Sequence, residues 1–124
     1  MPISHTIFYG CLLGIWSRSP SLERYFREKH PEHEYRSAGV NKYHTGKHGT
    51  NCIGLGDVLW SDVIVYAEEI HKTVTHRYYQ DYLNRAEYRK TELVLNLGDY
   101  NKEAMTEYCI KAKQIINEKL YLWN

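Results

Sequence analysis

The chain has 124 residues, of which 43% are apolar and 25% are charged, and its formal net charge is +1. A chain of this length ordinarily folds as one domain with a sizeable core, so we expect a single domain over residues 1–124. The near-neutral charge gives no strong sign of nucleic-acid or membrane-surface binding. Residues 1–5 lack the features of a signal peptide, and no apolar run approaches the roughly 20 residues of a membrane span, which predicts a cytoplasmic protein.

The first predicted elements are a strand at residues 3–9 and a helix at residues 21–30. The strand is rich in β-branched and aromatic residues, which favour a buried position in a sheet. The helix has apolar residues at i, i+3 and i+4, the spacing of a face that packs on a core. We expect Ser19 to cap the amino end of this helix and Pro20 to occupy its first position, where a missing N–H breaks no hydrogen bond.

Extended and helical patterns continue to alternate through the rest of the chain. Further strands are expected at residues 34–38, 63–66 and 92–97, a helical turn at 57–60, and helices at 68–82 and 101–120. This alternation predicts an α/β domain in which a small four-stranded, mostly parallel sheet is flanked by helices on both faces. Ligands of such sheets bind outside the carboxyl ends of the strands, where the strand order reverses. The residues that follow the first strand lie at such an end.

The two longest predicted helices carry apolar repeats. In the helix at 68–82, an apolar residue recurs at every fourth position: Ile70, Val74, Tyr78 and Tyr82. The helix at 101–120 has a broader apolar face, formed by Met105, Tyr108, Cys109, Ala112, Ile115, Ile116 and Leu120.

The segment between the first strand and the first helix is a candidate anion-binding loop. It contains a glycine and an arginine and leads into a helix, whose first backbone N–H groups and dipole attract negative charge. The Arg18 guanidinium adds a planar fork of donors that matches phosphate oxygens. We therefore predict that a phosphate-sized ligand contacts Leu12, Leu13, Gly14, Ile15, Trp16, Ser17, Arg18 and Ser19.

Several short motifs, in the same order along the chain, resemble those of the low-molecular-weight protein tyrosine phosphatases, and in particular of their short bacterial relatives. The matching stretches are Arg18-Ser19-Pro20 with Glu23, Arg36-Ser37-Ala38-Gly39, Trp60-Ser61-Asp62-Val63-Ile64 with His71, and Leu97-Gly98-Asp99-Tyr100. The resemblance implies a strand followed by Cys-x5-Arg-Ser-Pro. In that family the cysteine thiolate attacks phosphorus, backbone amides and the arginine hold the phosphate, and an aspartate protonates the leaving group.

The cysteine of this chain departs from the family's spacing. Counted back six positions from Arg18, the nucleophile position holds Leu12, whereas Cys11 gives Cys-x6-Arg. In one interpretation Leu12 occupies the nucleophile position and the loop is catalytically dead. Gly14 agrees with this, since the family commonly has a glycine two residues after the nucleophile. In the other, the loop is one residue longer and Cys11 is the nucleophile. Trp16 agrees with that, because some short relatives have Cys-x4-Trp-Arg.

The general acid is also altered in this sequence. The family's acid is usually an aspartate followed by proline, and the chain contains no Asp-Pro pair. Asp99, in the loop after the last predicted strand, is the best substitute, although it equally fits the cap of the helix that begins near Asn101. Loss of both the nucleophile and the acid is typical of a binding protein built on an enzyme's fold.

We therefore predict a phosphatase-like domain that is catalytically degenerate and binds a phosphorylated ligand or a protein partner through residues 12–19. The alternative is an active cysteine-dependent protein tyrosine phosphatase in which Cys11 and Asp99 are catalytic. A further alternative is an interaction protein with an exposed aromatic surface, for which residues 121–123 are one candidate.

Neither a metal nor another cofactor is expected. The three cysteines, Cys11, Cys52 and Cys109, are widely spaced, and the last two fit buried reduced thiols better than metal ligands. The closely spaced histidine pairs lie in a glycine-rich loop or beside a proline, which favours solvated side chains over a zinc site.

Overall fold

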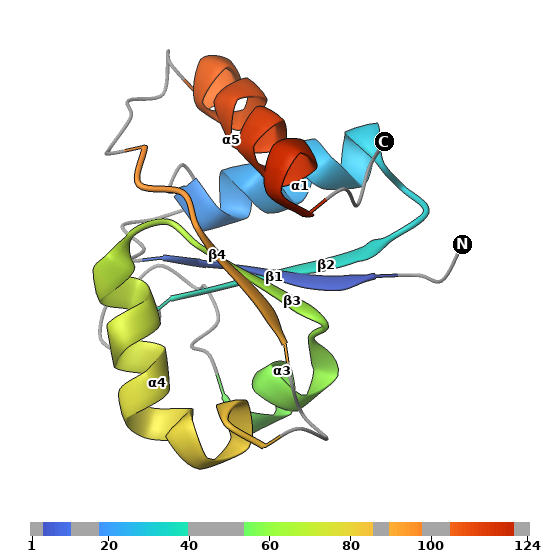
Figure 1. Ribbon diagram of the computed structural model, residues 1–124. Helices are drawn as coiled ribbons and strands as arrows, with labels where there is room; N and C mark the ends of the chain where they lie inside the picture. Colours follow the sequence, from blue (N-terminus) through green and yellow to red (C-terminus); the bar gives the residue numbers. More distant parts are fainter. Residues whose placement is uncertain (1–3, 11–17, 40–53, 86–89, 98–104, 121–124) are drawn as a thin grey trace.

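The computed structural model describes residues 4–10, 18–39, 54–85, 90–97 and 105–120, and Figure 1 traces their arrangement. The described strands are β1 (His5–Gly10), β2 (Glu34–Gly39), β3 (Val63–Tyr66) and β4 (Thr91–Val94). The described helices are α1 (Arg18–Lys29), α3 (Leu55–Trp60), α4 (Glu69–Leu83) and α5 (Met105–Leu120). Strands and helices alternate along the chain, as the sequence predicts.

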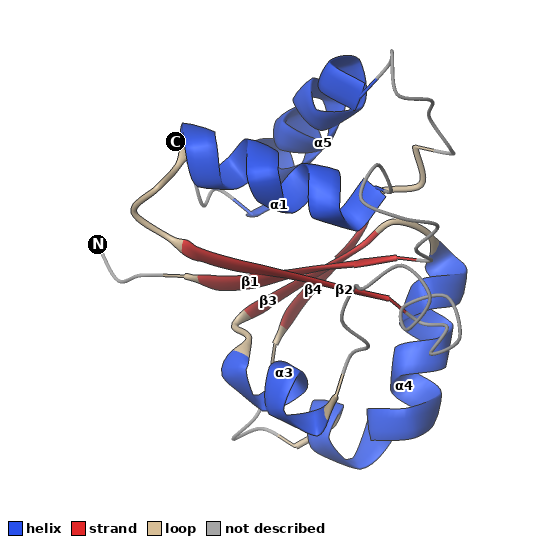
Figure 2. Cartoon of the chain, turned by 180° about the vertical axis from the view of Figure 1, so that it is seen from behind, coloured by secondary structure: helices blue, strands red, loops and turns tan. Residues whose placement is uncertain are grey.

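The four strands form one parallel sheet in the order β2-β1-β3-β4. β1 lies in its interior, where residues 6–9 pair with both β2 and β3. Helices α1 and α5 cover one face of the sheet, and α3 and α4 cover the other (Figure 1 and Figure 2). The predicted α/β architecture, a small four-stranded parallel sheet between two helical layers, is therefore confirmed.

Two apolar clusters fill the space on either side of the sheet. Side chains alternate between the two faces along a strand, so neighbouring residues of β1 belong to different clusters. Phe8 shares a cluster with Phe26 of α1 and Ile116 of α5, whereas Ile7 shares one with Val58 of α3. The core is thus divided by the sheet into two parts.

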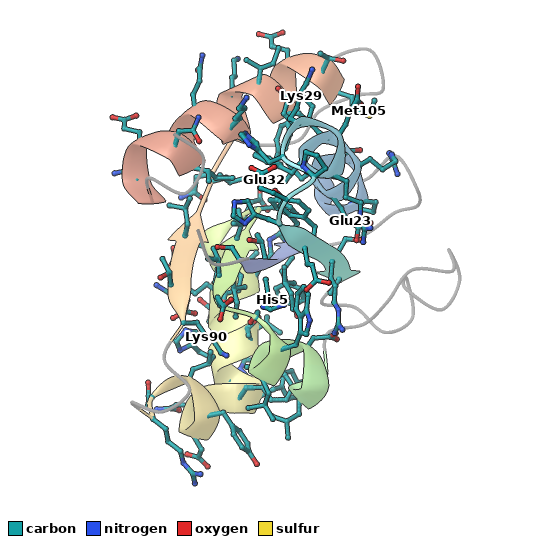
Figure 3. All side chains as sticks on the ribbon, turned by 90° about the vertical axis from the view of Figure 1, so that its right-hand side faces the viewer. His5, Glu23, Lys29, Glu32, Lys90 and Met105 are labelled. Carbon is teal, nitrogen blue, oxygen red and sulfur yellow. The ribbon has the colours of Figure 1, made fainter. Side chains whose placement is uncertain are left out.

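Helix α5 packs on the α1 side of the sheet with the face that the sequence predicts. Its buried residues are Tyr108, Cys109, Ala112 and Ile116. Figure 3 views the sheet from the side and shows α1 and α5, marked by Lys29 and Met105, in the same layer. None of the helices in the described part of the chain is long and apolar enough to cross a membrane.

The start of α1 and the end of β4 differ from the sequence prediction by about three residues each. Helix α1 begins at Arg18, so Ser19 lies inside the first turn and not at the N-cap, and Pro20 is the third helical residue. The first turn tolerates proline because its N–H groups have no acceptor within the helix. Strand β4 ends at Val94, before its predicted end, and Asn96 then has a positive φ of 52°. Asparagine is one of the few residues that adopts this left-handed conformation readily, and it takes the chain out of the sheet.

Helix α4 is present as predicted, but its buried residues are not those of the apolar repeat. Ile70 and Tyr78, two members of that repeat, are 57% and 72% exposed. The buried residues of this helix are His71, Thr75 and Leu83. The apolar repeat is therefore not the face that packs on the core.

The physical reason is that His71 and Thr75 satisfy their polar atoms within the helix. Nδ1 of His71 accepts the N–H of Glu68 at 3.0 Å, and the Thr75 hydroxyl donates to the His71 carbonyl at 2.9 Å. Polar groups that are bonded in this way can be buried at little cost. The backbone at Tyr79 is non-helical (φ −128°, ψ 25°), so the regular repeat also ends before Tyr82.

Candidate functional site at the carboxyl edge of the sheet

The carboxyl ends of β1 and β3 lie side by side in the middle of the sheet, where the strand order reverses. From β1 the chain continues through α1 to β2, and from β3 it continues through α4 to β4. The two helices lie on opposite faces of the sheet (Figure 1). In open parallel sheets, ligands bind in the crevice that such a reversal creates. This edge is therefore the candidate site.

Backbone hydrogen bonds fix the start of α4 at this edge. The Ala67 N–H donates to the Tyr9 carbonyl at 2.9 Å, and the Asn96 N–H donates to the Ala67 carbonyl at 3.0 Å. The Leu95 N–H donates to the Tyr66 carbonyl at 2.9 Å. The carboxyl ends of β1, β3 and β4 are thus joined through the main chain.

Helix α1 brings its amino end to the same edge. It begins at Arg18, after residues 11–17, which follow Gly10 at the end of β1. Ser21, in its first turn, is buried, and its carbonyl oxygen lies 3.8 Å from Cys109 Sγ of α5. The helix dipole places partial positive charge at this end, and the first N–H groups have no acceptor within the helix. The position therefore suits an anion.

Three buried aromatic side chains support this edge from the α4 side. The His71 ring is 1% exposed and lies 6.3 Å from the Tyr9 ring, centre to centre, and Tyr9 contacts the Tyr66 ring at 5.9 Å. Because His71 Nδ1 accepts the Glu68 N–H, a neutral imidazole here carries its proton on Nε2. His71 is therefore held in one orientation and one tautomer.

A polar cluster joins α4 to the edge strand β4. The Tyr66 hydroxyl donates to Glu92 Oε1 at 2.7 Å, and His76 Nε2 lies 2.7 Å from the same oxygen. Burial, and then the hydrogen bond to Glu92, raises the pKa of Tyr66 well above its ordinary value, so the hydroxyl remains a donor. This cluster was not predicted. The available signal was Glu92, a charged residue at the start of an apolar strand, which needs a polar partner there.

No protein-family model and no curated protein matches this sequence. Solved structures do match the fold. Wzb of Vibrio vulnificus, in complex with benzylphosphonate, is 16% identical with a TM-score of 0.69, over 96% of this chain and 100% of that chain. SP-PTP, a low-molecular-weight protein tyrosine phosphatase from Streptococcus pyogenes, is 9% identical with a TM-score of 0.67, over 95% and 94% of the two chains. The YwlE arginine phosphatase from Geobacillus stearothermophilus is 14% identical with a TM-score of 0.56, over 96% and 97%.

This chain has the fold of the low-molecular-weight protein tyrosine phosphatases. The predicted resemblance is thereby confirmed at the level of the fold. Within this phosphatase fold, Cys11, residues 12–17 and Asp99 lie outside the described residues, so their roles stay predictions. Arg18 and Ser19 lie in the first turn of α1, and their side chains are likewise outside what the structure describes.

Cys109 is not suited to act as a nucleophile. It is 2% exposed, and burial raises the pKa of its thiol to about 11. A thiol with so high a pKa stays protonated at neutral pH and is a poor nucleophile. The prediction that Cys109 is a buried free thiol is confirmed, whereas Cys52 lies outside the described residues.

Several described histidines form hydrogen bonds or ion pairs with other residues of the chain. His71 caps α4, His76 contacts Glu92, and His5 contacts two carboxylates at the other end of the sheet. Among the described residues, no three histidine, cysteine, aspartate or glutamate side chains are placed to hold a metal ion.

Proposed function

We propose that this chain is a phosphatase-like domain that binds a phosphate group, free or on a protein partner, through residues 12–19 and does not hydrolyse it. The spacing of Leu12, Cys11 and Arg18 carries this proposal. In the family that the sequence resembles, the nucleophilic cysteine stands six positions before the arginine, and here that position is Leu12. A leucine side chain has no nucleophile, whereas backbone amides and an arginine suit phosphate binding with or without turnover.

The fold supports the binding half of the proposal. Helix α1 begins at Arg18, next to the reversal of strand order between β1 and β3. A helix amino end offers unpaired N–H groups to an anion. Wzb of Vibrio vulnificus, which has the same fold, was solved in complex with benzylphosphonate. The ligand group that we expect is therefore a tetrahedral oxyanion.

The spacing supports the loss of catalysis because phosphoryl transfer depends on placement. A misplacement of about 1 Å already costs roughly a hundredfold in rate. One residue of extended chain spans about 3.3–3.6 Å. A cysteine that is displaced by one residue is therefore too far from its working position, unless the loop itself is rebuilt around it.

Ligand binding and turnover test the two halves of the proposal separately. We expect phosphate to raise the Tm of the full chain, because a ligand at ten times its Kd stabilises the folded state by about 1.4 kcal/mol. Arg18→Gln should remove that shift, and Lys119→Gln, at the far end of α5, should keep it. An unchanged Tm with phosphate, sulfate and vanadate contradicts the binding, and turnover of an aryl phosphate contradicts the loss of catalysis.

A second candidate is an active cysteine-dependent phosphatase with Cys11 as nucleophile and Asp99 as general acid. The observation in its favour is that β1 stays paired with β2 through Gly10, so Cys11 directly follows the paired strand. Among proteins of this fold, SP-PTP is a tyrosine phosphatase and the Geobacillus YwlE is an arginine phosphatase, so phosphotyrosine and phosphoarginine are both test substrates.

This candidate predicts turnover that Cys11→Ser abolishes and Leu12→Ala does not. Asp99→Asn should lower kcat by about 100-fold or more, as expected for a lost general acid. A wild-type chain that hydrolyses neither substrate across the acidic to neutral pH range contradicts it.

A further inference from the structure

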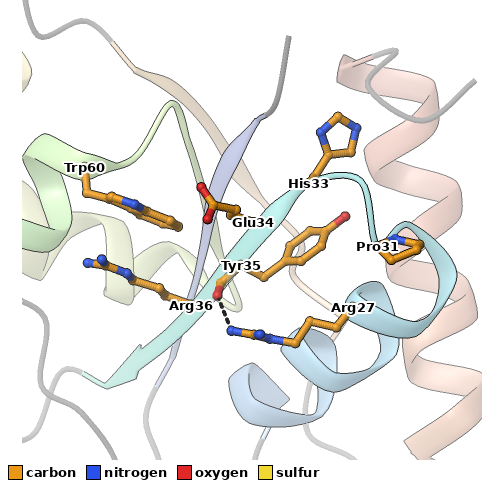
Figure 4. A pocket seen from close by; sticks show the side chains of 7 residues that line it. All are labelled: Arg27, Pro31, His33, Glu34, Tyr35, Arg36 and Trp60. Carbon is orange, nitrogen blue, oxygen red and sulfur yellow. Dashed lines mark hydrogen bonds between the residues drawn. The ribbon is translucent and has the colours of Figure 1, made fainter. Parts of the chain in front are cut away.

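A pocket of about 390 Å³ lies at the outer edge of β2, at the opposite end of the sheet from the carboxyl edge. Its lining comes from Arg27 in the last turn of α1, from Pro31 and His33 between α1 and β2, from residues 34–36 at the start of β2, and from Trp60 at the end of α3 (Figure 4). A volume of several hundred Å³ suits a small ligand or a few residues of a peptide. We call this site the β2-edge pocket.

Arg36 is held in one orientation on the α3 side of this pocket. Its guanidinium carbon lies 4.0 Å from the centre of the Trp60 ring, and its Nη1 donates to Asp57 Oδ1 at 2.9 Å. Asp57 is itself fixed, because its Oδ2 accepts the Gly54 N–H at 3.0 Å. A guanidinium has several further N–H donors, and a donor that is already oriented loses little entropy when a ligand binds.

Arg27 is the corresponding arginine on the α1 side of the pocket. Its Nη2 donates to the Tyr35 carbonyl at 2.7 Å, and its Nε lies 3.5 Å from Glu23 Oε2. The pair with Glu23 is long, and the Arg27 side chain is 60% exposed, so this pair holds the guanidinium only weakly. Tyr35 packs with Phe26 between the sheet and α1, whereas Arg36 faces α3, as alternation along a strand requires.

Glu34 gives the pocket one negative group. It is two positions before Arg36 on β2, so the two side chains share the α3 face. Glu34 Oε2 lies 2.6 Å from His5 Nε2, but the Glu34 side chain remains 61% exposed. Along β2, the pocket therefore presents the Glu34 carboxylate, then the Arg27 guanidinium beside Tyr35, then the Arg36 guanidinium.

We propose that the β2-edge pocket binds an extended peptide segment of a partner protein, with side chains in the order basic-acidic-acidic or the reverse. In an extended segment beside β2, the first and third side chains point to the α3 face and the middle one to the α1 face. A basic residue then faces Glu34, and the two acidic residues face Arg27 and Arg36. Opposite charges on neighbouring strands stabilise such pairing. The direction of the peptide decides which of the two orders applies.

This proposal does not rest on the proposed function. The residues that carry it lie around the start of β2, and none belongs to the segment of residues 12–19. Arg18→Gln should therefore leave peptide binding unchanged while it removes the effect of phosphate. Failure of either proposal is thus seen separately from failure of the other.

Three end-blocked pentapeptides of identical composition test the order of charges on the full wild-type chain: Thr-Lys-Glu-Glu-Thr, Thr-Glu-Glu-Lys-Thr and Thr-Glu-Lys-Glu-Thr. The indole N–H signal of Trp60 in an NMR titration reports on the pocket. We expect one of the first two peptides to bind about tenfold more tightly than the third, because the third loses charge-assisted hydrogen bonds. Equal binding of all three, or no shift of the Trp60 signal with any of them, overturns the proposal.

Variants of the chain then test the three charged groups. Arg27→Gln and Arg36→Gln should each weaken the favoured peptide by about tenfold, whereas Lys29→Gln, on the same helix as Arg27, should not. Glu34→Gln should abolish the preference for lysine over glutamine at the basic position of the peptide. Undiminished binding to both arginine variants overturns the proposal. The comparison of peptide orders uses the wild-type chain, so it holds even where a variant fails to fold.

Discussion

Main-chain hydrogen bonds join the strand ends at both edges of the parallel sheet, but the amino edge carries a side-chain network in addition. At the carboxyl edge, the main-chain bonds come from Ala67 and Asn96. At the amino edge, they come from the N–H groups of Glu34, Asp62 and Thr91, and the His5 side chain also lies between the carboxylates of Glu34 and Asp62. Main-chain bonds survive most substitutions, so both edges keep their geometry while the residues around them change. The ion pairs of the amino edge, in contrast, depend on particular residues.

Main-chain bonding at both edges agrees with the low identity between this chain and proteins of the same fold. Wzb and SP-PTP share only 16% and 9% of their residues with it. A sheet that is held by backbone bonds and by an apolar pattern requires few particular residues. Chemistry at its carboxyl edge can therefore be gained or lost while the fold stays intact.

The largest effect on stability should come from β1, which both edges share. Phe8 is fully buried, and its ring stacks on Phe26 at 5.2 Å. Phe8→Ala should lower the free energy of unfolding by about 3–5 kcal/mol, because it leaves a cavity in the core. Urea denaturation measures this. Thr91→Ala, at an exposed position of β4, should change it by no more than about 0.5 kcal/mol, and equal effects of the two substitutions contradict the core assignment.

A smaller effect is expected from Cys109 at alkaline pH. Burial raises the pKa of this thiol from an ordinary value of 9.0 to about 11 in the folded chain. Between these two pKa values, the folded chain keeps the thiol proton that the unfolded chain has lost. The contribution of this thiol to stability is therefore complete below pH 9.0, and it is lost as the pH rises from 9.0 to about 11. Near pH 11 we expect the free energy of unfolding to be lower by about 2 kcal/mol.

Urea denaturation of the wild-type chain and of Cys109→Ala across this pH range checks the prediction. The variant should lack this part of the pH dependence. Identical dependence in the two proteins contradicts it.

The next effect concerns the carboxyl edge. His71→Ala removes the acceptor for the Glu68 N–H and the contact with Tyr9, and should cost about 1–2 kcal/mol of stability. His71→Asn, whose side-chain oxygen can accept the same N–H, should recover part of this loss. Amide exchange at Glu68 should quicken in His71→Ala alone, and equal exchange in both variants contradicts the capping role.

The smallest effect on stability should come from the amino edge. The Arg36–Asp57 pair is partly exposed, with side chains 45% and 25% accessible, so it is worth less than about 1 kcal/mol. In Arg36→Met the side chain still packs on Trp60, and we expect a change in the free energy of unfolding below that value. Peptide binding at the β2-edge pocket should nevertheless weaken by about tenfold. A large loss of stability in Arg36→Met, with peptide binding unchanged, contradicts this prediction.

The sequence was sufficient for most of the fold. The strand at residues 63–66 was predicted with the bounds that the structure has, because a short run of apolar, β-branched residues is a local signal. The buried face of α4 could not be predicted from apolar spacing, because that spacing does not show that His71 and Thr75 satisfy their own polar atoms. The roles of Cys11, Asp99 and residues 12–19 in the candidate site stay predictions.

The sequence by itself determined the alternation of strands and helices, and hence the parallel sheet, because each element is encoded by its own apolar period. It also determined that six residues separate Cys11 from Arg18, which is a property of the covalent chain. Only the tertiary structure decided which distant residues meet. His5 and Asp62 are 57 positions apart in sequence and in contact in the sheet. No local pattern encodes such a pair, because the packing of the strands brings the two residues together.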